Sequence, residues 1–597
     1  MAKMSRKTFI KQTSLAGVLA MSPMGIGVIN GQKKSSSKKD IDENLLKRLA
    51  EGNDKQADSI LKMYSENQVS PYGYRNYTAN FAVLSAAYCC PLSKYYQNKT
   101  LIPSMESIVD DLLKFQNPDG TMDAGNLQSP PDTAFMMENL IKGTHILLQD
   151  KSKELNSVKE KSKLFITKAA NTIAEGGIHT PNHRWAVSSV LANVNALYPD
   201  QKYVDRINDW LGEQPFIDND GEYSERSKNY ARVNNSAFIE IGRQLDKPEL
   251  FDLVRKNLDL TYYQMEPNGE VITNNSRRQD QFSIQNIIES YLFYRYLAIR
   301  DNDGKFASVS KTIEALDGFE NVIINRALPS FMDEPLLQKN LPEPVLMPVD
   351  YEKVYTDSSL VRIRRGNTTT TLFGGNDWPL IIASGRSHIP NFFAYRKGDA
   401  ILRYMRYSTR FFSTGYFRSQ GLRQEGDKYV LFQRLEVPYY HPLPAEYRNP
   451  KGDYKHSPSI DDRFWSKMDF EHRPTTMKIL ETSISLEEEN GRSELTFLTT
   501  GSEKVPVTIE LCFDVNGKLT GVTNANTGTD NYFLEDGYGK YQAGNDVIEF
   551  GPGVVAHRGI QGLEGEKYST HSGNLRPPGL HVYLTGITPF EHKIVFF

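Results

Sequence analysis

One short stretch of the chain is dense in polar side chains that can transfer protons or hold charge. Residues 178–185 read Ile-His-Thr-Pro-Asn-His-Arg-Trp, and the Thr180-Pro181 pair can open a helix. A helix that begins there would carry Asn182 and His183 in its first turn. The imidazole could then serve as a general base, or it could simply cap the helix or pack locally.

A second candidate cluster lies in the loop of residues 220–230. It supplies the side chains of Tyr223, Glu225, Arg226 and Tyr230. Phenol and carboxyl groups can exchange protons, and a guanidinium group can hold an anion. The chain contains 32 tyrosines, so a single tyrosine is a weak signal by itself. Tyr223 and Tyr230 are stronger candidates than other tyrosines because they lie in a type of loop that recurs along the chain.

A third cluster opens the second half of the chain. Residues 384–393 read Ser-Gly-Arg-Ser-His-Ile-Pro-Asn-Phe-Phe and contain Arg386 and His388. The segment lies between strand-like stretches, so it could face the helical half or pack onto the linker. Asn126 and Asn274 lie in two further polar loops and are candidates for hydrogen bonding to a polar ligand.

The hydrophobic period changes once along the chain. Up to about residue 315, apolar residues recur every three or four positions, which predicts helices over residues 44–64, 107–115, 187–197, 236–245 and 284–297. From about residue 354 the period is two, which predicts strands over residues 359–364, 479–486, 493–499, 507–513 and 581–584. We therefore expect an α+β multidomain protein with domains at residues 40–327 and 349–597, joined by a proline-rich linker, residues 328–348.

The helical half also repeats itself. Glycine-centred turns recur roughly every 50 residues, a spacing that fits two helices and their connections. Such hairpins stack either into an open solenoid or into a closed ring. Five or six units favour an α/α toroid with the loops gathered at one end around a cleft. The second half predicts an antiparallel β-sandwich. The repeated turns are residues 71–74, 117–120, 175–177, 218–221 and 266–269.

Composition excludes several classes of protein. With 39% hydrophobic and 24% charged residues the chain is an ordinary globular protein, and its net charge of -3 argues against nucleic acid as the main partner. Three cysteines, Cys89, Cys90 and Cys512, exclude a disulfide framework and a CxxC zinc site. We predict no cofactor, and a structural metal ion in the β half cannot be inferred from its scattered histidines. The aromatic excess suits sugar rings and large β-sheets equally well.

The N-terminal residues 1–39 predict export. A cationic head around Arg6-Lys7 precedes a short apolar run, residues 15–29, and then a Lys/Ser tract. The head is similar to a twin-arginine signal with Arg-Lys in place of the arginine pair, which favours the periplasm as destination. A buried first helix is the alternative. No later segment approaches about 18 uninterrupted apolar residues, so we expect no membrane span.

Together the first two clusters resemble a known family. Asn182-His183, the loop of residues 220–225 (Asp-Gly-Glu-Tyr-Ser-Glu) and Tyr230 are similar to the motifs of heparinase II/III-type polysaccharide lyases and their alginate-lyase relatives. In those families an Asn-His pair on a toroid helix precedes an Asp-Gly loop with a Glu and a Tyr. A β-sandwich domain follows, and a histidine loop near its start reaches the active site. His388 fills that place here.

The resemblance implies β-elimination on a uronate-containing glycan. Asn182, helped by Arg386 or His388, would neutralise the uronate carboxylate. Tyr230 would be the acid, and also the base when proton and leaving group share a face, while His183 would be the base for the opposite epimer. Tyr223 is the reserve candidate for Tyr230. An ordinary tyrosine titrates near ~10, so a nearby cation such as Arg226, or a histidine, would have to stabilise the phenolate.

Two other functions stay open. Toroids also host glycoside hydrolases, which need two carboxylates, and the loops offer Asp119, Asp123, Asp132, Asp220 and Glu225. A non-catalytic glycan-binding protein is the third possibility. On the lyase interpretation, the lack of a Lys/Arg surplus favours a weakly charged glycan with occasional glucuronate, such as the rhamnose-glucuronate linkages of arabinogalactan.

Overall fold

The computed structural model describes residues 40–66, 73–375, 381–382, 385–386, 389–560 and 578–597. The chain separates into two units, Met1–Ile41 and Asp42–Phe597, and the second unit contains both predicted domains. The predicted export signal of residues 1–39 lies outside the described residues, as does His388. None of the helices in the described part is long and apolar enough to span a membrane.

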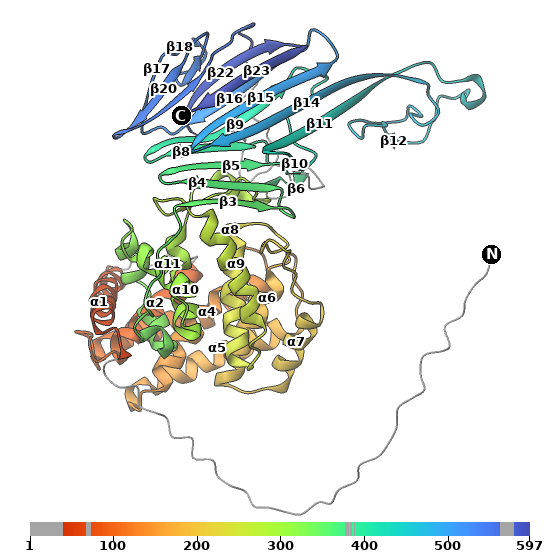
Figure 1. Cartoon of the computed structure of the whole chain (residues 1–597). Helices are drawn as coiled ribbons and strands as arrows, with labels where there is room; N and C mark the ends of the chain where they lie inside the picture. Colours follow the sequence, from red (N-terminus) through yellow and green to blue (C-terminus); the bar gives the residue numbers. More distant parts are fainter. Residues whose placement is uncertain (1–39, 67–72, 376–380, 383–384, 387–388, 561–577) are drawn as a thin grey trace, which may run out of the picture. The chain divides into compact units, whose positions relative to one another are not determined.

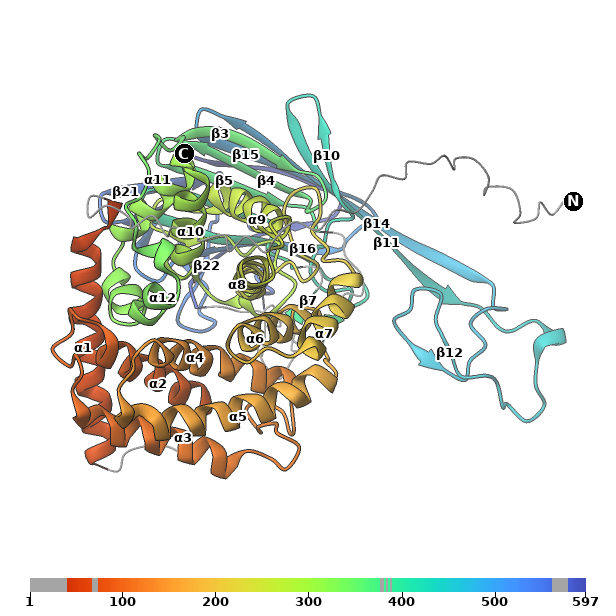
Figure 2. The same cartoon turned by 90° about the horizontal axis from the view of Figure 1, so that it is seen from below.

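The first domain is built from helices in two layers (Figures 1 and 2). Helices α2, α4, α6 and α8 pack against one another in sequence, and α3, α5, α7 and α9 lie outside them. Inner α2 buries eleven of its residues, whereas outer α7 buries only Tyr203 and Ile207. This difference is the expected one between a helix that is covered on all sides and an amphipathic surface helix. The α-helices are α1 (Glu43–Ser65), α2 (Tyr74–Cys89), α3 (Ile102–Phe115), α4 (Pro130–Leu148), α5 (Asn156–Glu175), α6 (His183–Leu197), α7 (Gln201–Gly212), α8 (Lys228–Gln244), α9 (Leu250–Gln264), α10 (Tyr291–Asp301), α11 (Gly304–Glu314) and α12 (Leu328–Asp333).

The repeated glycine turns connect an outer helix to the next inner one. Gly120 and Gly221 have φ angles of 101° and 106°. A Cβ on either would lie 2.6 Å from a backbone oxygen, that of Lys168 or Lys256, on the neighbouring outer helix. Only glycine fits such a position. Because each inner helix starts after one of these turns, the N-termini of α4, α6 and α8 share one end of the domain.

The second domain consists of two large, almost entirely antiparallel sheets. Their facing side chains form one apolar core, to which β5 and β9 of one sheet and β14 and β15 of the other contribute. The nine-stranded sheet contains β3 (Asp350–Tyr355), β4 (Leu360–Arg365), β5 (Thr368–Phe373), β8 (Phe393–Lys397), β9 (Ala400–Thr409), β16 (Pro506–Phe513), β18 (Thr523–Asn524), β19 (Asn531–Phe533) and β22 (Leu580–Ile587). The eight-stranded sheet contains β10 (Leu422–Glu425), β11 (Lys428–Tyr440), β14 (Thr475–Glu489), β15 (Arg492–Gly501), β17 (Lys518–Thr520), β20 (Gly539–Ala543), β21 (Asp546–Gly551) and β23 (Phe590–Phe596).

Three two-stranded ribbons complete the described strands: β1 (Glu270–Val271) with β2 (Gln285–Asn286), β6 (Ile381–Ile382) with β7 (Gly385–Arg386), and β12 (Ser457–Pro458) with β13 (Trp465–Ser466). Helices first and a two-sheet β domain second is the predicted α+β fold class, which is thereby confirmed. The predicted linker is partly ordered into α12 and a 3-10 turn, Pro335–Gln338. Leu328 and Phe331 are buried in the helical core, which explains why this part folds with the first domain.

Ion pairs join the two domains. Glu266 and Glu270 belong to the last glycine turn of the helical domain, and they face arginines on β4, β8 and β9. Glu266 pairs with the fully buried Arg362 at 3.0 Å, and Glu270 pairs with Arg403 at 2.7 Å and with Arg396. Buried charges are tolerated only when they are paired, so this contact fixes how the sheet meets the turn.

Candidate active site

Asn182 is buried at the start of α6, where Glu225 sets the orientation of its amide. The backbone N–H and Nδ2 of Asn182 both donate to Glu225 Oε2, at 3.0 and 2.6 Å. A carboxylate can only accept at this contact, so the amide cannot be flipped. Asn182 Oδ1 is buried and has no hydrogen-bond partner among the described residues. A buried acceptor without a partner is costly, and it is available to a ligand.

His183 follows as the first residue of α6 and is 8% exposed. Its ring packs edge-on against His179 and Phe135, with centroid separations of 4.6 and 5.5 Å. Burial, reinforced by the charge of His179, lowers the pKa of His183 to about 4, although Asp132 opposes the shift. The imidazole is therefore neutral at pH 7. Its Nδ1 has no hydrogen-bond partner in the part of the chain that the structure describes.

Tyr230 lies in the first turn of α8, with its phenol oxygen facing two donors from a different loop. Gln279 Nε2 donates to Tyr230 Oη at 2.8 Å, and Arg278 Nη2 donates at 3.2 Å. The guanidinium of Arg278 also lies over the phenol ring, 4.3 Å from its centroid. The phenol oxygen thus accepts hydrogen bonds from two donors and lies beside a cation.

Two arginines lie in this region. Arg226 Nε donates to the backbone oxygen of Asn275 at 3.0 Å, and its guanidinium lies over the ring of Phe373 at 5.7 Å. Arg278, from the loop before α10, is the cation that contacts the Tyr230 phenol. The role predicted for Arg226 beside the phenol stays a prediction.

Arg278 also joins the separate parts into one cluster. It donates to Glu225 as well as to Tyr230, so that a continuous chain of contacts runs from Asn182 to the phenol. Its charge reaches His183, where it helps to lower the pKa. The structure thus brings Asn182, His183, Glu225 and Tyr230 together, as expected from the sequence.

Asp280 holds the loop that carries Arg278. Its carboxylate accepts hydrogen bonds from Ser227 Oγ at 2.9 Å, from Ser276 Oγ at 2.8 Å and from the backbone N–H of Lys228 at 2.8 Å. Ser227 is the N-cap of α8. The 3-10 turn η4 (Gln279–Phe282) is therefore fastened to the start of the helix that carries Tyr230.

Asn126 and His179 lie at the exposed edge of the cluster. Asn126 Nδ2 donates to Asp132 Oδ2 at 2.8 Å and lies 3.4 Å from His179 Nε2. Burial would raise the pKa of Asp132, but hydrogen bonds from Asn126 and Ser129, together with Arg75, lower it. Asp132 is thus an ionised anchor for the loop beside His183.

The cluster has a positive potential from the backbone itself. His183 and Tyr230 occupy the first turns of α6 and α8, and Asp132 the first turn of α4. The helix dipoles favour negative charge at these ends, and the carboxylates of Glu225 and Asp280 already accept hydrogen bonds from the backbone N–H groups of Asn182 and Lys228 there. No group of three or more potential metal ligands occurs among the described residues.

Comparisons with known proteins identify the fold. No family model and no curated protein matches the chain. Solved structures do match: heparinase III at 10% identity covers 87% of this chain and 75% of its own, with a TM-score of 0.54. The chondroitin AC lyase of Streptomyces coelicolor A3 in complex with chondroitin sulphate, at 12% identity, covers 92% and 79%, with a TM-score of 0.53. A Paenibacillus xanthan lyase at 10% identity covers 89% and 54%, with a TM-score of 0.51.

The chain has the polysaccharide-lyase fold. At these identities the likeness concerns the fold and its toroid-plus-β layout, so the roles of individual residues are argued from the geometry alone. Within this polysaccharide-lyase fold, the cluster around Tyr230 lies at the N-terminal ends of the inner helices. It faces the side on which the β domain contacts the toroid.

Not every predicted site residue joins the cluster. Tyr223 is 4% exposed and donates to Asn235 Oδ1 at 2.7 Å, and burial raises its pKa well above the usual value. It therefore serves the core of the polysaccharide-lyase scaffold. Asn274 lines a separate cavity between the domains. Arg386 lies in β7 and its side chain is not described, and His388 lies outside the described residues.

Three residues of the cluster were not predicted: His179, Arg278 and Gln279. His179 belongs to the same eight-residue stretch as His183. Arg278 and Gln279 lie three and four residues after Asn275, just beyond the third of the repeated polar loops. Equivalent loops of a ring converge at one end, so extending this loop by four residues would have included them.

Proposed function

We propose that the chain is a lyase that cleaves a uronate-containing glycan by β-elimination. The observation that carries the proposal is the cluster itself, in which a neutral imidazole, a phenol with two donors and an oriented amide meet at helix N-termini. These are the groups that elimination needs: one to neutralise a carboxylate, one to remove a proton and one to protonate the leaving oxygen.

The first step is neutralisation of the uronate carboxyl group. An ionised carboxylate opposes the carbanion that forms next to it, so its charge must be masked. After its bond to Glu225, the Asn182 amide still has one N–H and the Oδ1 acceptor. A protonated carboxyl group offers one acceptor and one donor, which matches this remaining pair. The positive ends of the helix dipoles stabilise any negative charge that remains on the uronate carboxyl group.

The second step moves one proton and breaks one bond. A base takes the proton from C5, the C5 electron pair forms the C4–C5 double bond, and the C4–O bond breaks. Tyr230 then protonates the departing oxygen. When the C5 proton is on the same face as the leaving group, the ionised Tyr230 removes it from C5 and then passes it to the departing oxygen. When it is on the opposite face, the neutral His183 is the base.

Arg278 and Gln279 make Tyr230 suitable for this exchange. Both donate to its oxygen, at 3.2 and 2.8 Å, and would hold that oxygen in place while the proton moves. Glu225 in turn holds both Arg278 and Asn182. A single carboxylate thereby sets the distance between the group that would mask the carboxyl and the group that would move the proton.

The loop carboxylates match a glycoside hydrolase less well. A hydrolase needs a general acid with a raised pKa and a second, free carboxylate. The pKa of Asp132 is lowered, and Glu225 is occupied by Asn182 and Arg278. Burial raises the pKa of Asp220, but its Oδ2 accepts the backbone N–H of Ser358 in the β domain at 2.8 Å.

For the substrate we propose a weakly charged glycan, with rhamnose-glucuronate linkages of arabinogalactan as the first candidate. The net charge of -3 gives no attraction for densely sulfated chains. The arginine nearest to the cluster, Arg278, is paired with Glu225. The cationic and apolar pattern of residues 1–39 supports an exported, periplasmic enzyme.

The test is ultraviolet absorbance during digestion of a glycan panel, measured together with the release of new reducing ends. Elimination produces a conjugated unsaturated uronate that absorbs, and hydrolysis does not. We expect both signals to rise together on a glucuronate-containing glycan. New reducing ends without absorbance would indicate that the protein is a hydrolase and not a lyase. Tight binding without either signal would indicate a non-catalytic glycan-binding protein.

A further inference from the structure

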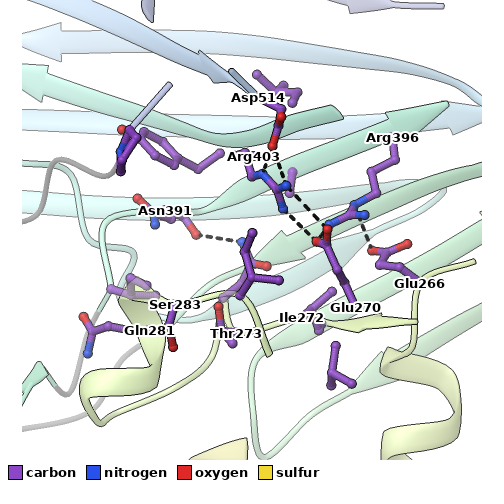
Figure 3. A pocket seen from close by; sticks show the side chains of 18 of the residues that line it. Glu266, Glu270, Ile272, Thr273, Gln281, Ser283, Asn391, Arg396, Arg403 and Asp514 are labelled. Atoms are coloured by element: carbon purple, nitrogen blue, oxygen red, sulfur yellow. Dashed lines mark hydrogen bonds and ion pairs between the residues drawn. The ribbon is translucent and has the colours of Figure 1, made fainter. Parts of the chain in front are cut away.

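A cavity of about 430 Å³ lies between the toroid and the nine-stranded sheet. Figure 3 shows Gln281 and Ser283 of the toroid on one side of it and Arg396, Arg403 and Glu270 gathered on another. Its volume falls in the range of small-molecule sites, about 300–1,000 Å³. Apolar side chains alternate with neutral polar ones around the wall. The apolar group comprises Val271, Ile272, Ile284, Ile389, Leu402 and Val515.

The charges in this wall are already neutralised. Arg403 bonds Glu270 at 2.7 Å and Asp514 at 2.7 Å, and Arg396 bonds Glu270. Burial would raise the pKa of Glu270, but the two arginines outweigh it and lower the pKa to about 2. Glu270 is therefore always ionised near neutral pH. Among the described residues of the wall, no positive charge is left over to attract an anionic ligand.

The cavity shares a wall with the Tyr230 cluster. Turn η4 contributes Gln279 to the phenol oxygen and Gln281 to the cavity. The two glutamines are two residues apart, and Gln281 Nε2 donates to the backbone oxygen of Arg278 at 2.9 Å. A sugar chain that places one residue at Tyr230 can thus place a neighbouring residue across the turn.

We propose that this cavity is a subsite for an uncharged sugar residue of the glycan that is cleaved at Tyr230. The proposal rests on the proposed function and specifies its substrate class: a uronate flanked by a neutral sugar. Ile272, Ile284 and Ile389 provide an apolar surface for the C–H face of a pyranose. Thr273, Asn274, Gln281 and Ser283 provide neutral donors and acceptors for its hydroxyl groups.

The same wall discriminates against a sulfated sugar. A sulfate in the cavity would lose its hydration and would find Arg396 and Arg403 already bound to carboxylates. Breaking those pairs would leave a carboxylate buried without a counter-charge, which is strongly unfavourable. A neutral hydroxyl group at the same carbon carries no such cost.

Binding of a matched pair of monosaccharides tests the subsite without any need for turnover. The probes are methyl β-D-galactopyranoside and its 6-sulfate, titrated into the whole protein by ligand-observed NMR and soaked into crystals. We expect the neutral probe to occupy the cavity and to bind at least about tenfold more tightly than the sulfate.

A charge variant at the mouth sharpens the test. Ile284 is 62% exposed there, so Ile284→Arg adds an unpaired cation without disturbing the core. We expect this variant to reduce the preference for the neutral probe by about tenfold. Leu346→Arg adds the same charge at a residue that is 96% exposed and does not line the cavity, and it should leave the preference unchanged.

Three outcomes overturn the subsite: equal or tighter binding of the sulfate to the wild type, a neutral probe located outside the cavity, or the same preference in Ile284→Arg and Leu346→Arg. None of them depends on cleavage. If the neutral probe occupies the cavity as expected but no glycan is eliminated, the subsite stands and the lyase proposal fails.

Discussion

Two clusters of buried polar side chains lie on opposite sides of turn η4, and their polar atoms are satisfied to different degrees. In the cluster around Tyr230, Asn182 Oδ1, His183 Nδ1 and Gln279 Oε1 have no hydrogen-bond partner among the described residues. In the interdomain cluster, Glu270 is bonded by both Arg396 and Arg403, and Arg403 is bonded by Asp514 as well.

The difference separates a site that awaits a ligand from one that holds the fold together. Unsatisfied buried polar atoms cost stability, so they persist where a ligand completes them. Saturated ion pairs gain nothing from a ligand, but removing one partner leaves the other charge buried. Substitutions in the first cluster should therefore affect turnover, and those in the second should affect folding.

The largest effect should come from Tyr230→Phe. Loss of the phenolic proton donor should reduce kcat by about 10³-fold or more, in the upper part of the range for general acid–base catalysis. The thermal unfolding midpoint should change little, because the side chain is half-buried and keeps its ring. Initial rates of ultraviolet absorbance give the first quantity and calorimetry the second. Turnover at the wild-type rate would remove Tyr230 from the mechanism.

Glu270→Gln should act on stability instead. We expect the free energy of unfolding to fall by about 3 kcal/mol, because Arg396 loses its main partner and Arg403 one of two. Glu436→Gln, at an exposed pair with Arg434, is the matched control and should cost at most about 1 kcal/mol. Denaturant unfolding measures both. Equal effects would mean that the interdomain pairs contribute no more than surface ones.

The ion pairs of Glu270 with Arg396 and Arg403 predict that the free energy of unfolding depends on pH. The pKa of Glu270 is lowered to about 2, so its contribution is complete above about pH 4.5 and is lost as the pH falls toward 2. Wild type and Glu270→Gln should therefore differ most at neutral pH and converge in acid. If the difference in unfolding free energy between the two proteins stayed constant across this pH range, the lowered pKa of Glu270 would be contradicted.

Arg278→Gln should reduce kcat by about 10²-fold for two reasons. The Tyr230 oxygen loses its neighbouring cation, and Glu225, which orients Asn182, loses its ion pair. Initial rates of ultraviolet absorbance measure the loss of turnover, and calorimetry shows whether the variant stays folded. Arg278→Lys keeps the charge but not both contacts, and should recover part of the rate. No recovery would argue against the electrostatic role.

A smaller effect on turnover should come from the protonation of His183 at acidic pH. With a pKa of about 4, it stays neutral down to about pH 5, and kcat/KM on a substrate that uses it as base should fall about tenfold per pH unit below 4. Stability should also decline as the pH falls from 6.5 toward 4, because the unfolded chain takes up this proton first. An acid limb near pH 6.5 would contradict the burial of the ring.

Tyr223→Phe should have the smallest effect and provides the contrast with Tyr230→Phe. Its hydroxyl bonds Asn235 in the core, so we expect a loss of about 1 kcal/mol in unfolding free energy and a turnover within about twofold of wild type. The same two assays apply to both tyrosines. A reversal of their effects would make Tyr223 the catalytic residue.

Much of the fold could be predicted from periodicity and turn chemistry. The change of period predicted at about residue 354 falls within β3 (Asp350–Tyr355), and the glycine turns match the connections into α4, α8 and α10. The helix predicted over residues 284–297 begins only at Tyr291, because residues 285–286 pair as β2 and residues 287–290 form a 3-10 turn. Pairing of β2 with β1 overrides the local helical pattern.

The candidate site was predicted less completely. Asn182, His183, Glu225 and Tyr230 could be named because each lies in a dense polar stretch, and the structure brings them together. Arg226 was expected beside Tyr230 because it is near in sequence, whereas Arg278, from 48 residues away, contacts the phenol. Sequence distance says little about which loops of a ring meet.

By itself the sequence determined which residues form helices, which form strands and where the chain turns, because these follow from side-chain period and from glycine and proline geometry. It also determined the residue types that could do chemistry. Only the tertiary structure decided which cation meets the phenol, which tyrosine is buried in the core and which charges cancel between the domains. Those outcomes depend on contacts between segments tens to hundreds of residues apart, whose distances local pattern does not encode.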